Sequence, residues 1–286
     1  MPDLWRSIAS GISDATGEPF FPLGKSAIGG GCISDAWLLE GNSGRYFVKT
    51  GKLPFEPEAA GLEAIGKAVR TPGVICLGCH EGRHWLALEY VEMSREVMRF
   101  DLLGASLAAL HRVPSGQFGW DIDNLIGSTP QINAPSKDWI EFWKARRLGF
   151  QFDLARRNGC DFGRRAEELM ENLDAFFVGH KPSPSLLHGD LWRGNAGFDA
   201  SGRPVLYDPA VYFGDREADI AMTELFGGFP REFYSAYIES FPLDPGYGTR
   251  KTLYNLYHVL NHLNLFGSGY LHQAASMIDA LLAEIR

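Results

Sequence analysis

Residues 187–195 (LHGDLWRGN), together with residues 206–209 (LYDP), constrain this chain more than any other part of its sequence. Asp190 is followed five residues later by Asn195, and Asp208 comes thirteen residues after that, with apolar, strand-like stretches between them. Phosphoryl transfer from a nucleotide needs such a set. One carboxylate accepts the proton of the attacking hydroxyl, and an amide oxygen with a second carboxylate holds Mg²⁺. Gly-Asp and Arg-Gly-Asn are also ordinary turn sequences, which is the alternative interpretation. The complete spacing favours Asp190 as the base and Asn195 and Asp208 as metal ligands.

A strand lysine and a helix glutamate upstream complete this pattern. Residues 45–49 read as a strand that ends in Lys49, and Pro57 then suits the first turn of a helix. Glu58 lies one turn before the apolar Leu62, so it can share the buried face, whereas Glu63 points away. We predict that Lys49 binds the α- and β-phosphates of ATP and pairs with Glu58. Glu63 is the competing partner, and a solvated edge lysine is the simpler alternative.

Three consecutive glycines precede that strand, Gly29, Gly30 and Gly31, and Cys32 follows them. Such a run lets backbone N–H groups approach a phosphate closely, but it suits a plain hairpin turn equally well. Its position before Lys49 favours a loop over the nucleotide. Cys32 is either a small residue in a tight turn or a redox-sensitive thiol whose oxidation would hold the loop away from the phosphates.

The next two apolar runs, residues 73–77 and 85–90, read as strands joined through residues 78–83. The second strand leads into a segment that we expect to bind adenine through its backbone. The residues of this expected ATP contact are Glu89, Tyr90 and Val91.

Cysteines in the same region form a pattern that also occurs at metal and haem sites. Cys76, Cys79 and His80 match C-x-x-C-H, the haem attachment signature, and His84 extends the group toward a zinc-like cluster. The second half of a four-ligand zinc site is missing from the sequence. Cysteines within a strand hairpin are therefore the favoured interpretation.

The rest of the chain is predicted to be mostly helical. Apolar spacing indicates helices at residues 100–111, 138–157, 164–177 and within 232–265. Asp219 is expected to open a helix that braces the catalytic loop. Trp192 is a candidate substrate contact, since an indole face packs well on a sugar or an amine; its alternative is loop packing. His262 belongs to a polar stripe that either satisfies buried groups or faces the sugar.

Several segments resemble the fructosamine kinase family, with similarity running from about residue 28 to residue 270. They are residues 29–33, 55–62, 188–192, 208–210, 212–217, 225–229 and 258–262. The resemblance implies ATP- and Mg²⁺-dependent phosphorylation of the sugar in fructosamine, ribulosamine or erythrulosamine adducts, after which the phosphate leaves readily and the amine is recovered. It also makes Asp215 a candidate substrate contact. The broader catalytic pattern is shared with aminoglycoside phosphotransferases and choline kinases, which are the runner-up. A nucleotide-binding pseudokinase scaffold is the alternative from a different class.

The fold that this resemblance implies is an α+β, bilobal protein-kinase-like fold. We expect an N-terminal lobe at 1–91, with a five-stranded antiparallel sheet and one helix, and a mostly helical lobe at 92–286. The 286 residues suffice for this, and a net charge of −8 argues against nucleic acid or an anionic membrane as partner. The N-terminus lacks signal-peptide features, so the cytoplasm is the expected location. The oligomeric state, and the choice between free and protein-bound ketoamines, stay open.

Protein kinases carry an arginine between the His and Asp of the catalytic loop, where it senses a phosphate on the activation loop. This chain has Gly189 at that position, and no A-P-E sequence follows Asp208. We therefore expect no activation-loop control and a small amino-sugar or ketoamine substrate.

Overall fold

The computed structural model describes residues 2–29 and 34–285, and these form two compact units. The first unit runs to Arg99 and also includes residues 197–208, and the second holds residues 100–196 and 209–286. The boundary expected at residue 91 differs from this division, because a later hairpin, β9 (Ala196–Phe198) and β10 (Pro204–Leu206), bonds to the first unit. The backbone N–H of Ser94 donates to Phe198, and that of Leu206 donates to Arg70.

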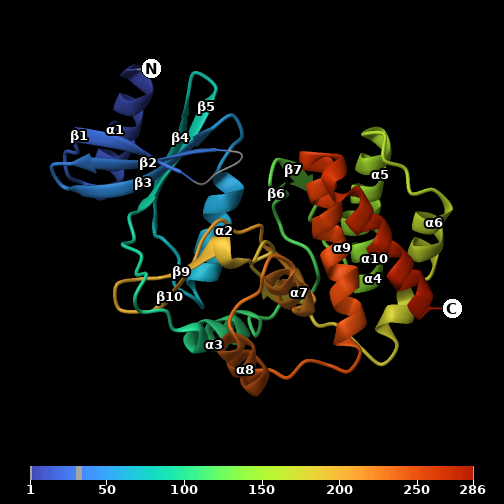
Figure 1. The fold of residues 1–286 in the computed structure, drawn as a ribbon. Helices are drawn as coiled ribbons and strands as arrows, with labels where there is room; N and C mark the ends of the chain where they lie inside the picture. The colour runs from blue at the N-terminus through green and yellow to red at the C-terminus, as the bar shows by residue number, and fades with distance from the viewer. Residues whose placement is uncertain (1, 30–33, 286) are drawn as a thin grey trace. The chain divides into compact units, whose positions relative to one another are not determined.

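The first unit is built on an antiparallel sheet of five strands in the order β1-β2-β3-β5-β4, as expected (Figure 1). The strands are β1 (Pro22–Ile28), β2 (Asp35–Gly41), β3 (Gly44–Gly51), β4 (Val74–His80) and β5 (Arg83–Glu89). Side chains alternate between the two faces of such a sheet. Two helices therefore find apolar surfaces on opposite sides of the same strands.

Helix α2 (Glu56–Gly66) packs on one face and α1 (Pro2–Thr16) on the other. On β5, Leu86 and Leu88 cluster with Leu62 of α2, while Trp85 and Ala87 belong to the cluster of α1. Helix α1 is an addition to the sheet and single helix that the sequence predicts. It buries Leu4, Ile8 and Ile12, whose spacing of four residues forms one helical stripe.

The β4–β5 hairpin predicted from the sequence is present, and it turns at Glu81 and Gly82. Cys76 and Cys79 both lie within β4. Because they are three residues apart on one strand, their side chains leave opposite faces and cannot share an ion. Burial raises the pKa of Cys76 to about 11, with a smaller contribution from Asp14, which further disfavours the thiolate that a metal requires. The hairpin geometry thus supports structural cysteines.

The second unit is mainly helical, and it also holds two short strand pairs. Its helices are α3 (Phe100–Leu110), α4 (Trp139–Trp143), the π-helix η1 (Lys144–Leu148), α5 (Gly149–Arg157), α6 (Arg164–Glu171), η2 (Leu173–Phe177), η3 (Arg193–Asn195), α7 (Glu217–Leu225), α8 (Arg231–Ser240), α9 (Tyr247–Phe266), η4 (Ser268–Tyr270) and α10 (Leu271–Glu284). Its strand pairs are β6 (Asn124–Ile126) with β7 (Thr129–Gln131), and β8 (Ser185–Leu187) with β11 (Tyr212–Gly214). The helices predicted at 138–157 and 164–177 are present, the first with a π-turn inside it.

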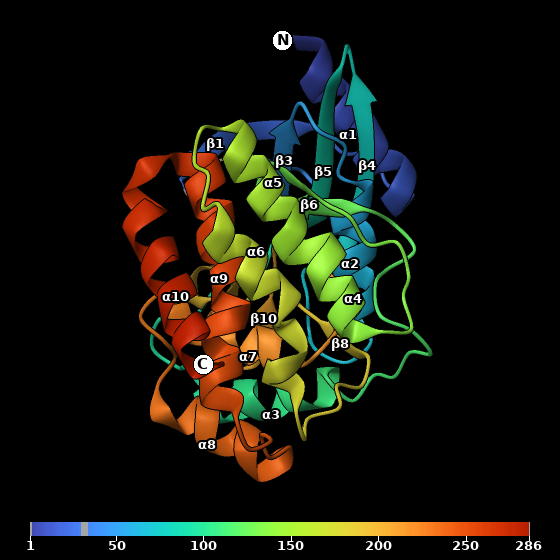
Figure 2. The same cartoon turned by 90° about the vertical axis from the view of Figure 1, so that its right-hand side faces the viewer.

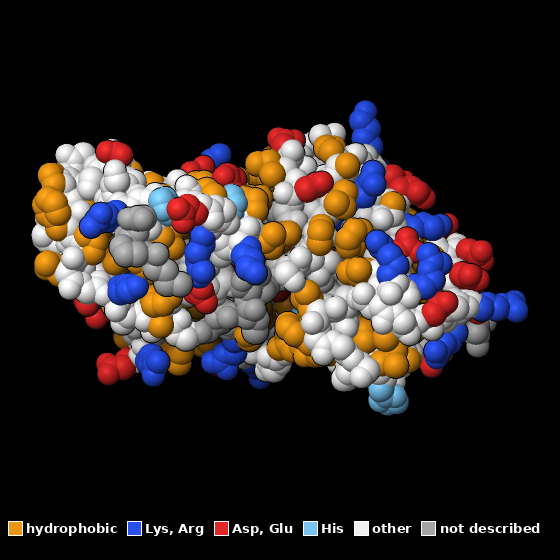
Figure 3. All heavy atoms as spheres, turned by 90° about the horizontal axis from the view of Figure 1, so that it is seen from above, with side chains coloured by type: hydrophobic (Ala, Val, Ile, Leu, Met, Phe, Trp, Pro, Cys, Tyr) orange, Lys and Arg blue, Asp and Glu red, His pale blue; other side chains and the backbone are white. Residues whose placement is uncertain are grey.

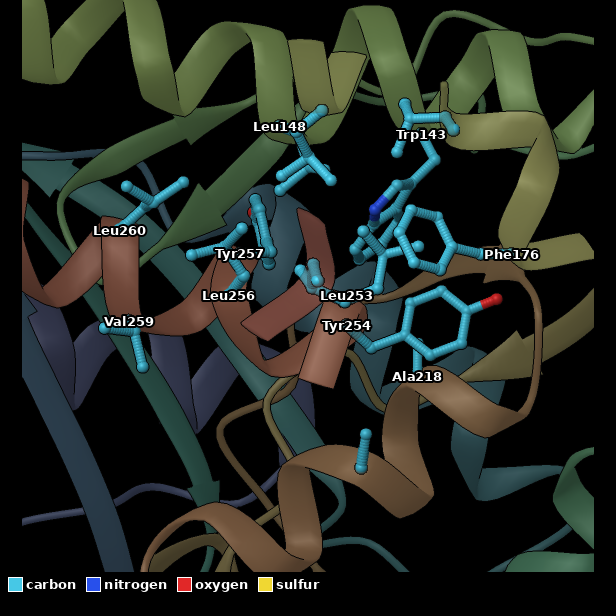
Figure 4. Close-up of a cluster of buried hydrophobic side chains, with 14 of the residues drawn as sticks. Trp143, Leu148, Phe176, Ala218, Leu253, Tyr254, Leu256, Tyr257, Val259 and Leu260 are labelled. Carbon is cyan, nitrogen blue, oxygen red and sulfur yellow. The ribbon is translucent and has the colours of Figure 1, made fainter. Parts of the chain in front are cut away.

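Helix α9 is the centre of this unit. Figure 2 shows α5, α6, α9 and α10 packed side by side. The apolar face of α9 is buried, and its Tyr257, together with the neighbouring Tyr254, contacts Trp143 (Figure 4). The rings of Trp143 and Tyr254 meet edge to face, with centroids 4.9 Å apart. This core includes Leu187 of β8 and Ala218 and Ala221 of α7, which precede and brace the loop of residues 188–195.

Charged side chains of both signs are intermixed on the face drawn in Figure 3. Within residues 2–29 and 34–285, none of the helices combines the length and the apolar character needed to cross a bilayer.

Candidate active site

Lys49 is the centre of a charge cluster in the first unit. Strand alternation places it on the face of β3 that α2 covers, where it is only 7% exposed. Its Nζ lies 2.7 Å from Oε1 of Glu58 and 2.6 Å from Oδ1 of Asp208. The predicted pairing with Glu58 is confirmed, whereas Glu63 is exposed on the other side of α2.

The charges in this cluster change one another's protonation. Burial alone would lower the pKa of Lys49, but the charges and hydrogen bonds of Glu58 and Asp208 raise it well above its ordinary value. Burial raises the pKa of Glu58, although Lys49 pulls it in the opposite direction. Lys49 therefore remains a cation at physiological pH, with two anions that hold its ammonium group in place.

Asp208 follows β10 in a conformation that side chains rarely adopt. Its φ is +56°, in the left-handed region, which costs energy for a residue other than glycine, though least for Asp and Asn. Its side chain is 46% exposed even though one oxygen binds Lys49. A strained, half-exposed carboxylate beside a buried lysine is a good candidate for a ligand-binding group.

Glu89, Tyr90 and Val91 follow directly from β5, as predicted. The carboxylate of Glu89 accepts hydrogen bonds from Arg70 at 2.8 Å and from the N–H of Gly73 at 3.1 Å. The Tyr90 ring lies under the guanidinium of Arg45 at 4.7 Å. The backbone N–H of Glu89 donates to the carbonyl oxygen of Gly73 at 2.7 Å. The contact of this segment with adenine stays a prediction.

The glycine-rich loop is described only in part. Gly29 follows β1 and is exposed. Gly30, Gly31 and Cys32 lie outside the described residues, so the loop and the redox role of Cys32 stay predictions.

In the second unit the catalytic loop begins where β8 ends, and a buried carboxylate braces it. Asp219 of α7 accepts the backbone N–H groups of His188 at 2.7 Å and Gly189 at 2.9 Å. The ring of His111 lies 3.1 Å from the same carboxylate. Burial would raise the pKa of Asp219, but the hydrogen bond and charge of His111 and the backbone bond of Gly189 hold it below its usual value. The predicted bracing role of Asp219 is confirmed, and His111 is a partner that sequence reasoning missed.

Asp190 and Asn195 are hydrogen-bonded to each other. The Asn195 amide nitrogen donates to the backbone oxygen of Asp190 at 2.8 Å and to its Oδ2 at 3.1 Å. Because an amide is planar, this arrangement directs the Asn195 oxygen away from Asp190 and makes it the atom suited to a metal. The loop thus presents one half-buried carboxylate and one oriented amide oxygen.

Two of the candidate substrate residues lie in one aromatic cluster. Trp192 is 39% exposed, and its ring packs against Phe226, which in turn contacts the His262 ring at 4.9 Å. The indole also covers Gly194 so closely that a Cβ there would lie 2.3 Å from it. The glycine at position 194 therefore leaves room for the Trp192 indole.

Asp215, the third substrate candidate, is buried away from any such surface, at 2% exposure. Its carboxylate binds His180 at 2.7 Å and Tyr254 at 2.5 Å, and it accepts the N–H of Glu217 at the start of α7. These bonds make Asp215 a residue that anchors α7, so we do not retain it as a substrate contact.

The side chains around Asp215 include a group with metal-ligand chemistry, His180, Glu217 and Asp244. Its members are already paired. Both ring nitrogens of His180 lie 2.7 Å from carboxylates, and Arg250 binds both oxygens of Glu217. The guanidinium supplies the positive charge that an ion would bring, so this is an internal ion network.

Comparison with known proteins agrees with this geometry. The sequence model of the fructosamine kinase family matches residues 4–284. A probable ketoamine kinase of Synechocystis sp. is 44% identical over 289 residues, which cover 98% of each chain. A chloroplastic protein-ribulosamine 3-kinase of Arabidopsis thaliana is 41% identical over 91% of this chain and 83% of its own. A solved structure from Haemophilus somnus, described as a candidate fructosamine-3-kinase, is 29% identical, has a TM-score of 0.90 and covers 97% of each chain. The chain therefore belongs to the fructosamine kinase family and has the kinase-like α+β fold that its sequence predicts.

Proposed function

We propose that this chain uses ATP to phosphorylate a sugar hydroxyl of ketoamines, the adducts that sugars form with amines. Membership of a family of kinases makes it a phosphotransferase, and curated relatives are named as ketoamine and ribulosamine kinases. Phosphate is a better leaving group than hydroxide, so the phosphorylated adduct would break down and release the amine. The biological outcome would be removal of sugar from amines.

The observation that carries the proposal is the position of Lys49 between Glu58 and Asp208. A cation that binds nucleotide phosphates must remain charged and must point in one direction, and both carboxylates contribute to this. The backbone of residues 89–91 and the glycine-rich loop are the proposed contacts of adenine and phosphate. Neither assignment requires a side chain that the fold already uses.

Asp190 is the proposed base for the acceptor hydroxyl. Its carboxylate is oriented by Asn195, and its loop is held by the backbone bonds to Asp219. General-base catalysis of this kind contributes about 10²–10⁴ in rate when the carboxylate is well placed. The family's aminoglycoside and choline relatives use similar loops, but the whole-chain match favours ketoamines.

Asn195 and Asp208 are the proposed ligands of Mg²⁺. Both offer oxygen atoms, which Mg²⁺ prefers, and the half-exposed carboxylate of Asp208 and the oriented amide of Asn195 fit that role. Bound Mg²⁺ would neutralise charge that develops on the phosphates. The cytoplasm stays the proposed location, although plant relatives are named chloroplastic.

An ATP-consumption screen tests the proposal. Ribulosamines, fructosamines, erythrulosamines, an aminoglycoside and choline would be compared with and without Mg²⁺. We expect turnover with at least one ketoamine, a requirement for Mg²⁺, and little turnover with the other acceptors. The Asp190→Asn protein serves as the control for contaminating ATPase. Consumption only with choline or the aminoglycoside would replace the proposed substrate class, and ATP binding without turnover of any acceptor would favour a pseudokinase.

A further inference from the structure

The second unit carries a chain of aromatic rings that begins in the catalytic loop and continues beyond it. We call it the aromatic strip, and it consists of Trp192, Phe226, His262, Phe266 and Tyr270. Successive ring centroids lie 4.9–6.4 Å apart, within the range of favourable ring contacts. The rings come from three separate segments: the catalytic loop, the end of α7, and α9 with η4. Packing from distant parts of the chain has thus assembled one surface.

The strip reaches solvent at both ends. Trp192 is 39% exposed and Phe266 is 54% exposed, while the rings between them are half-buried. Large apolar side chains at the surface usually mark a binding surface when they are contiguous. Trp192 is two residues from Asp190 in the chain, so the strip starts at the proposed acceptor position.

His262 supplies the one polar atom that the middle of the strip can offer. Its Nδ1 lies 2.8 Å from the carbonyl oxygen of His258, one turn earlier, so in the neutral ring Nδ1 carries the proton and Nε2 is the acceptor. Burial lowers the pKa of His262, although the hydrogen bond to His258 opposes this. At physiological pH the ring is therefore uncharged, and its Nε2 can accept a hydrogen bond.

These properties match one part of a ketoamine. Its nitrogen is a protonated secondary amine that carries N–H donors, and cations of this kind are attracted to aromatic faces. The substituent on that nitrogen is the part of the substrate that varies from one adduct to another. None of the five strip residues is acidic, so attraction to the amine would come from ring faces and from one acceptor.

We propose that the aromatic strip binds the amine portion of the ketoamine and selects adducts whose amine bears an aromatic or apolar group. This inference rests on the proposed function and goes beyond it, because it assigns the preference among adducts of one sugar. Trp192 and Phe226 would hold the ammonium, His262 would accept its N–H, and Phe266 and Tyr270 would contact the substituent.

The test compares two ribulosamines that differ only in their amine, benzylamine or ethylamine. We expect the native enzyme to have the higher kcat/KM for the benzylamine adduct. Phe266→Ala should lower kcat/KM for that adduct by about 3- to 10-fold, the size of a lost ring contact, and change the ethylamine value by less than about 2-fold. Because Phe266 is exposed, its removal should leave the melting temperature close to that of the native protein.

Phe21→Ala is the matched control, since Phe21 is also exposed, at 64%, and lies outside the strip in the first unit. It should leave both kcat/KM values unchanged. His262→Phe keeps a ring but removes the hydrogen-bond acceptor, and it should lower kcat/KM for both adducts to a similar degree.

The possible outcomes separate the two proposals. Equal kcat/KM for the two adducts, unaffected by Phe266→Ala, would overturn the role of the strip and leave ketoamine phosphorylation intact. ATP consumption with neither adduct, nor with any other ketoamine, would overturn the proposed function and the role of the strip with it.

Discussion

The two units hold their proposed catalytic residues by different means. In the first, Lys49 is positioned by the side-chain charges of Glu58 and Asp208. In the second, the loop of Asp190 is positioned by backbone N–H groups that donate to the buried Asp219. Side-chain ion pairs can exchange one partner for a phosphate, whereas backbone bonds fix the chain itself. The proposed phosphate-binding groups can therefore change partners when a ligand binds. The proposed base is instead held close to the position that proton transfer requires.

The largest effect is expected at Asp208, which serves both the lysine and the proposed metal. Asp208→Ala should abolish Mg²⁺-dependent turnover, because it removes a proposed metal ligand and one of the two anions that hold Lys49. Lys49→Ala should instead retain Mg²⁺ dependence at a much lower rate. Turnover would be measured across a Mg²⁺ titration with each variant. Full activity of Asp208→Ala with Mg²⁺ would remove Asp208 from metal binding.

The next effect is at the base. Asp190→Asn keeps the shape of the side chain but cannot accept a proton, so kcat should fall by about 10²–10⁴. Affinity for ATP should change little, because the variant leaves the Lys49 cluster intact. Steady-state kinetics and ATP titration would separate the two quantities. Near-normal kcat would exclude Asp190 as the base.

Asp219→Asn tests whether backbone bracing matters for catalysis as well as for stability. The amide offers one acceptor oxygen in place of two, so one backbone N–H of His188 or Gly189 loses its partner. We expect kcat to fall by about 10- to 100-fold, as small displacements of catalytic groups do, with KM for ATP unchanged. The melting temperature would be recorded in parallel. A loss of stability with kcat preserved would show that the brace serves only the fold.

Glu58→Gln tests the side-chain charges that position Lys49, and its expected effect on activity is smaller. Because burial raises the pKa of Glu58, the native carboxylate takes up a proton at a higher pH than an ordinary glutamate and then no longer attracts Lys49 as an anion. Native activity should therefore decline on acidification. Glu58→Gln should be less active at neutral pH, by about 10-fold, and should lack that part of the decline. Identical pH–rate profiles for the two proteins would contradict this role.

The smallest effect concerns the stability of the second unit. Burial opposes the protonation of His180, but the hydrogen bond and charge of Asp215 raise its pKa. A raised pKa in the folded state contributes stability that is fully present below the ordinary value of about 6.5 and is lost as pH rises through the folded value. The melting temperature of the native protein should thus fall in this range by about 2–4 °C more than that of His180→Gln. Melting curves would be recorded for both proteins at several pH values. An equal decline in melting temperature for the two proteins would show that the His180–Asp215 pair does not contribute.

Local rules in the sequence sufficed for the pairing of Lys49 with Glu58. Strand alternation and the apolar stripe of one helix determine which faces these two side chains occupy, and both patterns are visible within a few residues. The same applies to the bracing role of Asp219, which follows from its place at the start of α7. Helix α1 was not predicted, although the spacing of Leu4, Ile8 and Ile12 carries the same kind of local pattern.

Partners that are distant in the chain could not be predicted in this way. Asp215 looks like part of an exposed motif, yet its partners His180 and Tyr254 are 35 and 39 residues away. Gly78 suggests a turn, but it lies inside β4 opposite Trp85 of β5, whose ring occupies the space where a Cβ would be, at 2.6 Å. In both cases the deciding contact comes from another element. The position of the aromatic strip depends on the same kind of packing.

The close approach at Gly189 has a consequence for how this enzyme could evolve. Its φ is +82°, and a Cβ there would lie 2.0 Å from the carbonyl oxygen of Ala210, whose own N–H donates to His188. No single substitution can therefore install the arginine through which protein kinases respond to phosphorylation. A descendant that acquired such control would first have to displace the segment after Asp208, at the expense of catalysis. The geometry at Gly189 thus closes one route to control by phosphorylation.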